Sequence, residues 1–115
     1  MTTLQIDDVV VKELNDWKNE FSNLQGNLER ALLDLEKELK VIEVKRHCLF
    51  SVKERTEGYS GVQKDIARDL YKNMDDRRNS LLDEIEQKKA DIAISIEMNK
   101  IIFEEVDKRI ALGGK

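Results

Sequence analysis

Hydrophobic residues recur in the first half of the chain at alternating intervals of four and three. The series runs through Val10, Leu14, Trp17, Phe21, Leu24 and Leu28, then Leu32, Leu35, Leu39, Ile42 and Leu49. This spacing places apolar side chains along one side of an α-helix, as in the contact line of a coiled coil. Two successive intervals of four around Leu28 predict a stutter, a local unwinding of the supercoil.

The second half carries a less regular apolar series of the same kind. Its members are Val62, Ile66, Leu70, Met74, Leu81, Ile85, Ile92, Ile96, Phe103, Val106 and Ile110. The intervals predict a second stutter around Ile92. If the chain folds back near residue 59, the two stutters lie at the same height, which favours pairing of the two halves with each other.

Glycine marks the one predicted loop. Gly58 and Gly61 bracket the segment 56–61, and the chain contains no proline. We expect a helix over about 7–56, the loop 56–61 and a helix over about 61–112. Equal long helices joined by a short loop form an antiparallel hairpin. The predicted fold class is therefore all-α, a long antiparallel two-helix coiled-coil hairpin that forms a single unit over residues 1–115.

The residues around this loop fit helix ends. Lys53 and Arg55 offset the negative end of a helix dipole, and Gly58 suits the left-handed position after a helix. Ser60 and Gln63 have the spacing of a capping box. Gly26 lies inside the first predicted helix, where it either permits a close approach between helices or is simply tolerated.

The apolar residues exceed what one hairpin can bury. Residues 90–106 are apolar around most of a helix circumference, so further helices are expected to cover them. We expect a homodimer in the form of a four-helix bundle, or pairing with other helical subunits. The expected interface residues are Trp17, Phe21, Leu24, Leu28, Leu32, Ile92, Ile94, Ile96, Ile101, Ile102, Phe103 and Val106.

Composition limits the remaining function classes. The chain has 115 residues, of which 38% are charged and 5% aromatic, with a net charge of −4. No apolar run is long enough to span a membrane, and the first residues lack the pattern of a signal peptide. A single cysteine forms no disulfide framework within the chain. These features predict a protein of the cytoplasm or nucleus.

The candidate chemistry is sparse. His47 and Cys48 are neighbours that point about 100° apart on a helix, and no second histidine or cysteine completes a zinc site. Asp7 and Asp8 suit a helix N-terminus, whereas the other acidic pairs are expected on solvated faces. We expect no enzymatic activity, no small-molecule substrate, no cofactor and no metal.

Charge is uneven along the expected hairpin. Residues 40–78 hold ten basic and seven acidic side chains, so the half nearest the loop carries +3. A basic tip could contact an acidic protein, a phospholipid or a nucleic acid, although ordinary solvated charge explains the pattern as well. The candidate contact residues are Lys45, Arg46, Arg55, Tyr59, Arg77 and Arg78.

The sequence thus favours a scaffold or adaptor subunit that mediates protein–protein assembly. Small subunits of kinetochore, organelle-tethering and chromatin complexes are of this general kind. An electrostatic binding module that docks through its basic tip is the alternative, and contact with nucleic acid or membrane is not the main expectation.

Overall fold

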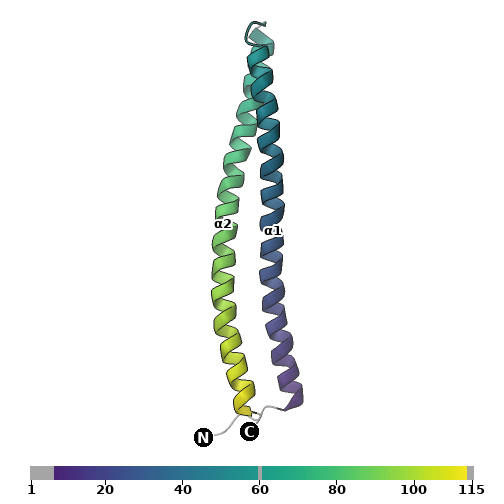
Figure 1. Cartoon of the computed structure of the whole chain (residues 1–115), viewed down its shortest axis with the longest axis vertical. Helices are drawn as coiled ribbons and strands as arrows, with labels where there is room; N and C mark the ends of the chain where they lie inside the picture. The colour runs from purple at the N-terminus through teal and green to yellow at the C-terminus, as the bar shows by residue number, and fades with distance from the viewer. Residues whose placement is uncertain (1–6, 60, 114–115) are drawn as a thin grey trace. The chain divides into compact units, whose positions relative to one another are not determined.

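Two long helices make up nearly all of the described chain. The computed structural model describes residues 7–59 and 61–113, with α1 at Asp8–Arg55 and α2 at Gly61–Gly113. The helices pair as a hairpin around one loop, and no strand occurs among the described residues (Figure 1). The prediction of an all-α helical hairpin is confirmed.

The helix ends have clear local causes. The Asp7 carboxylate Oδ1 accepts a hydrogen bond from the Val10 N–H at 3.0 Å, so Asp7 is the N-cap of α1. At the other end, the Thr56 N–H and Oγ1 both donate to the Val52 carbonyl, at 3.0 and 2.9 Å. Lys53 and Arg55 occupy the last turn of α1, as expected.

One prediction about the loop is wrong. Gly58 does not adopt the left-handed conformation, because no described glycine has a positive φ. Thr56 instead satisfies the last carbonyls of α1 with its own side chain, which removes the need for a left-handed residue there. The predicted capping box rests on Ser60, which lies outside the described residues.

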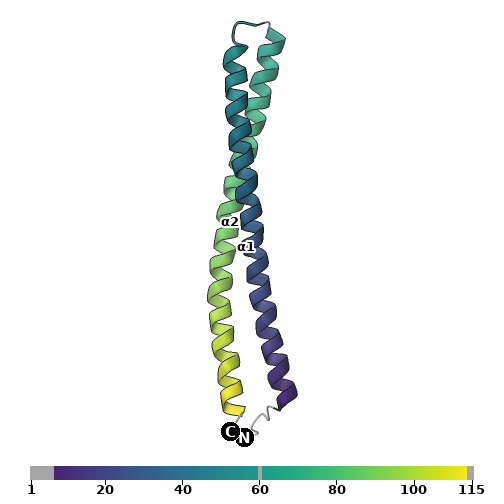
Figure 2. The ribbon, with the colours of Figure 1, turned by 45° about the vertical axis from the view of Figure 1, so that its right-hand side comes forward.

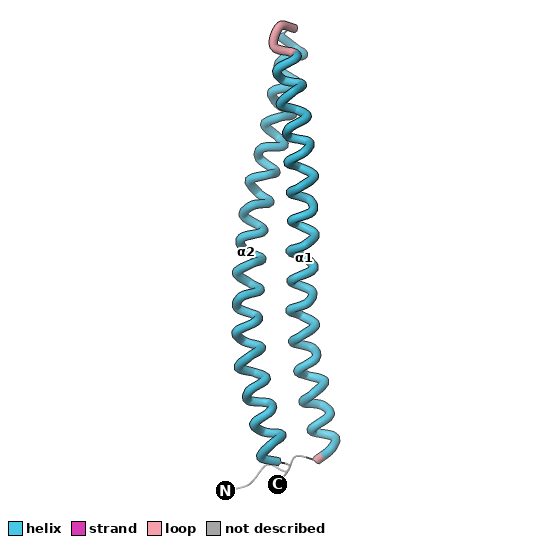
Figure 3. Tube along the Cα trace, in the orientation of Figure 1, coloured by secondary structure: helices cyan, strands magenta, loops and turns pink. Residues whose placement is uncertain are grey.

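The hairpin consists of two compact units, each built from a part of both helices. The terminal unit comprises Met1–Arg30 and Lys89–Lys115, of which residues 7–30 and 89–113 are described. The loop unit comprises Ala31–Lys88. Figure 2 gives a second view of α1 and α2, and Figure 3 marks the loop that joins the two helices.

The side of α1 that faces α2 differs in part from the predicted one. Twelve less exposed positions form a series with alternating intervals of three and four: Val11, Leu14, Lys18, Phe21, Gln25, Leu28, Leu32, Leu35, Leu39, Ile42, Arg46 and Leu49. Gly26, Ala31 and Glu43 are less exposed as well and lie next to members of this series. Val10, Trp17 and Leu24 are exposed and do not belong to this series. The predicted stutter at Leu28 is therefore wrong, because Lys18 and Gln25 continue the inward-facing pattern where apolar residues were expected.

The inward-facing side of α2 needs the same correction. Its least exposed positions are Ala67, Tyr71, Met74, Arg78, Leu81, Ile85, Lys88, Ile92, Ser95, Asn99, Ile102 and Val106. Val62, Ile66, Leu70 and Ile96 were expected on this side but are exposed. The stutter predicted at Ile92 is absent, since Ser95 and Asn99 maintain the three-four spacing.

The interior is thin. Ile42, Ala67, Leu81, Ile85 and Val106 are the apolar residues that are buried among the described positions, and Leu81 is the most deeply buried. Most other inward-facing side chains are only half-buried. Much apolar surface therefore remains outside the contact between α1 and α2.

Candidate interaction surface

A polar contact fixes the pairing of the helices in the terminal unit. Asn99, which is buried, donates from Nδ2 to the Gln25 Oε1 at 2.9 Å and to the Phe21 carbonyl at 3.3 Å. Lys18 pairs with Asp107 at 2.7 Å, and its ammonium lies 5.2 Å from the centre of the Phe103 ring. Polar groups at inward-facing positions favour one register over others.

Trp17 lies on an exposed side of this unit. Its ring packs edge to face against Phe21, with ring centroids 5.1 Å apart, and its side chain remains 44% exposed. A groove of about 240 Å³ beside it is lined by Leu14, Trp17, Ile101, Ile102, Glu105, Val106 and Arg109. The groove shows that Trp17 of α1 and Ile101 of α2 border the same surface.

Helical spacing extends this surface in both directions. Val10 and Leu24 lie seven residues from Trp17, on the same side of α1, and Leu24 is 57% exposed. Ile94 and Met98 lie seven and three residues before Ile101, on one side of α2, and are 62% and 50% exposed. We call these six residues, Val10, Trp17, Leu24, Ile94, Met98 and Ile101, the apolar face.

The predicted interface residues separate into three groups. Phe21, Leu28, Leu32, Ile92, Ile102 and Val106 are inward-facing, and Leu32 belongs to the loop unit. Trp17, Leu24, Ile94 and Ile101 lie on the apolar face. Ile96 is exposed and lies about 140° around the axis of α2 from Ile101. Phe103 is half-buried and lies on the same side as Ile96.

Sequence reasoning missed two members of the apolar face. Val10 was placed in the contact between the helices, and Met98 was not selected as an interface residue. The seven-residue spacing of Val10, Trp17 and Leu24 was the available signal, because it marks a second apolar line on α1 beside the inward-facing one.

Carboxylates flank the apolar face on both helices. Glu13, Asp16 and Glu20 follow one another along α1 and line a second groove of about 310 Å³ with Val10 and Trp17. On α2, Glu97 and Glu104 lie three residues after Ile94 and Ile101, and both are exposed. We call these five residues the acidic rim.

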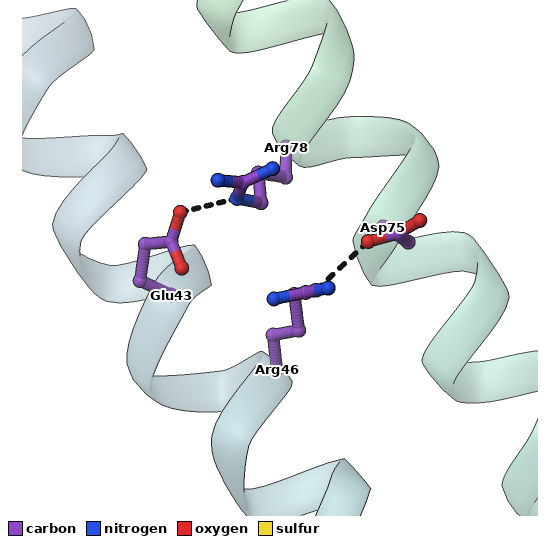
Figure 4. A network of polar contacts seen from close by, with 4 residues as sticks. All are labelled: Glu43, Arg46, Asp75 and Arg78. Atoms are coloured by element: carbon purple, nitrogen blue, oxygen red, sulfur yellow. Dashed lines mark hydrogen bonds and ion pairs between the residues drawn. The ribbon is translucent and has the colours of Figure 1, made fainter.

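Ion pairs across the helices dominate the loop unit. Arg46 contacts Asp75 at 2.8 Å, and Arg78 contacts Glu43, so the two pairs bridge α1 and α2 side by side (Figure 4). The hydrogen bond and charge of Glu43 raise the pKa of Arg78. Both arginines occupy inward-facing positions, and the Arg46 guanidinium also lies 5.4 Å from the centre of the Tyr71 ring.

Arg77 makes a further pair on the surface of the same unit. Its guanidinium contacts Glu38 at 2.7 Å and Glu84 at 3.7 Å. The hydrogen bonds that Arg77 donates to the Glu38 carboxylate raise the pKa of Arg77, and burial opposes this rise. Arg77 thus joins the two helices rather than presenting a free charge.

The predicted basic tip is therefore divided. Arg46, Arg77 and Arg78 are held by carboxylates of the chain itself. Lys45, Arg55 and Tyr59 are exposed, as a contact surface requires. Three of the six candidate residues are thus already engaged within the loop unit.

The remaining chemical candidates stay apart. His47 and Cys48 are both exposed, and Cys48 is a free thiol. Within residues 7–59 and 61–113, no three His, Cys, Asp or Glu side chains gather as a metal site would require. Neither helix, over its described length, contains a stretch apolar enough to cross a bilayer.

No protein-family model, curated protein or solved structure matches the chain.

Proposed function

We propose that the chain is a non-enzymatic coiled-coil scaffold or adaptor subunit that works inside the cell. It mediates assembly by self-association, including a four-helix bundle, or by pairing with other helical subunits of a larger complex. The supporting observation is the apolar face of the terminal unit, where Trp17, Leu24, Ile94 and Ile101 are about half exposed or more. A face of this kind marks a protein interaction site.

The thin interior supports the same proposal. Strict three-four spacing of inward-facing positions on both helices is the pattern of coiled-coil packing. Small domains with little buried apolar area gain stability from association with further chains. Burial of the apolar face in a bundle adds apolar contact at about 25 cal/mol for each Å² removed from water.

The electrostatic alternative receives less support from the geometry. Half of its candidate residues are neutralised by Glu38, Glu43 and Asp75 within the loop unit. Assembly through the apolar face does not require these ion pairs to break.

Paired substitutions on α2 test this proposal. Ile101→Asp places a carboxylate on the apolar face, whereas Ile96→Asp makes the same change at a similarly exposed position elsewhere on the helix. We expect Ile101→Asp to weaken assembly at least tenfold, because a buried unpaired charge is costly. Ile96→Asp should leave assembly close to that of the wild type.

Light scattering after size-exclusion chromatography measures self-association of the full chain. Affinity purification of the tagged chain from its own cells measures association with other subunits. A chain that stays monomeric at all concentrations and loses no associated subunit through Ile101→Asp would contradict the proposed function.

A further inference from the structure

The charge around the apolar face restricts what can cover it. The acidic rim follows the outer edge of the face on both helices, with three carboxylates on α1 and two on α2. Glu105 adds a carboxylate inside the groove beside Trp17. Lys108 and Arg109 are the basic residues beside it, and Arg109 lines the groove at the end of α2.

The terminal unit as a whole has the same bias. Its described residues carry eleven acidic and seven basic side chains, whereas the loop unit carries thirteen acidic and twelve basic ones. One of the seven bases, Lys18, is already paired with Asp107. The acidic surplus therefore accompanies the apolar face.

A second copy fits this face poorly. Two copies can pack face to face with α1 of one copy over α2 of the other. The Glu13–Glu20 row of one copy then lies opposite Glu97 and Glu104 of the other. They can also pack with α1 over α1 and α2 over α2, in opposite directions. Each acidic row then lies opposite the same row of the other copy. Both two-fold arrangements thus oppose like charges at the edges of the contact, which disfavours association.

We infer that the apolar face binds a single amphipathic helix of another protein, whose apolar stripe is flanked by lysine or arginine side chains. This inference rests on the proposed function and names the partner's chemistry. The stripe would pack between α1 and α2 beside Trp17, while the basic flanks would meet the acidic rim on both edges. The same carboxylates disfavour nucleic acid and anionic lipid at this face.

The dimensions suit one helix of about two heptads. Val10 and Leu24 are fourteen residues apart, which corresponds to about 21 Å along α1. A partner helix of this length would contact apolar residues from both helices of the terminal unit. Its basic flanks would also set its specificity, because rim charges select among partners.

Three synthetic helices test the inference on the full chain. The first has a leucine stripe with lysine flanks, the second has the same stripe with glutamate flanks, and the third has lysine flanks with serine in place of leucine. None contains tryptophan, so the emission of Trp17, the single tryptophan of the chain, reports binding directly. We expect a blue shift with the first peptide only.

Charge reversal then tests the acidic rim. The double variant Glu13→Lys/Glu20→Lys should bind the first peptide at least tenfold more weakly than the wild type and should allow the second peptide to bind. Glu36→Lys/Glu86→Lys makes the same change in net charge on exposed residues of the loop unit and should alter neither affinity. Circular dichroism of each variant verifies that the helices are retained.

Several results would overturn the inference. Equal binding of the leucine-striped peptides would show that charge does not select the occupant, and absence of binding would show that the face takes no helix. A blue shift on raising the concentration of the chain alone would identify a second copy as the occupant. That last result refutes the basic helix but leaves the proposed assembly function intact.

Discussion

At the scale of single residues, Gly26 resolves an alternative that the sequence left open. A Cβ added at this position would meet only the Arg30 guanidinium of the same helix, 4.0 Å away, which is an ordinary contact. No residue of α2 approaches Gly26 closely enough to require glycine. The residue is therefore tolerated within α1 rather than needed for packing of the hairpin.

This reading predicts that Gly26→Ala stabilises the chain. Alanine lowers the conformational entropy of the unfolded state and favours the helix, a gain of about 0.5–1 kcal/mol. Urea unfolding followed by circular dichroism measures the change. A loss of stability would show instead that a neighbouring chain approaches α1 closely at Gly26.

At the scale of the elements, Leu81 and Leu82 separate the inward and outward sides of α2. Leu81 is fully buried against α1, whereas Leu82 is 37% exposed. Leu81→Ala should lower the free energy of unfolding by about 2–5 kcal/mol, because it leaves a cavity between the helices. Leu82→Ala should change it by about 0.5 kcal/mol. Equal effects of the two substitutions in urea unfolding would contradict the assigned orientation of α2.

The same orientation explains what could be predicted from the sequence. The helix ends were predictable because Asp7, Lys53, Arg55 and Gly58 mark breaks in a long helical pattern. The inward-facing side was only partly predictable, since α1 carries two apolar lines that share Leu14, Phe21 and Leu28. Hydrophobicity alone favours the outer line, because Trp17 and Leu24 lie on it, whereas the inward line has Lys18 and Gln25 at the corresponding places.

Polar residues decide between the two lines. Asn99 lies inward because it finds partners in Gln25 and the Phe21 carbonyl, and Lys18 lies inward because it pairs with Asp107. These partners are distant in sequence, so spacing along one helix does not reveal them. The stutter predicted on α1 arose where the assigned line passed from the outer series to the inward one, and the stutter on α2 arose where it left the inward series for exposed Ile96.

At the scale of the whole molecule, the two units carry different surfaces. The loop unit joins its helices through charge pairs such as Arg46–Asp75, and the terminal unit carries the apolar face with its acidic rim. The acidic rim could not be recognised from the sequence, because it is defined by position beside the apolar face. This surface is the basis on which we propose assembly of the terminal unit with a helical partner.

Accessibility of Trp17 tests this central claim most directly. Acrylamide quenching of its fluorescence is measured in the dilute isolated chain and in the assembly purified from cells. Partner proteins in the assembly either lack tryptophan or have their tryptophans replaced, so that the signal comes from Trp17. We expect strong quenching in the isolated chain, where the side chain is 44% exposed, and a severalfold decrease in the assembly. Equal quenching in the two states would contradict the assignment of the apolar face as the assembly surface.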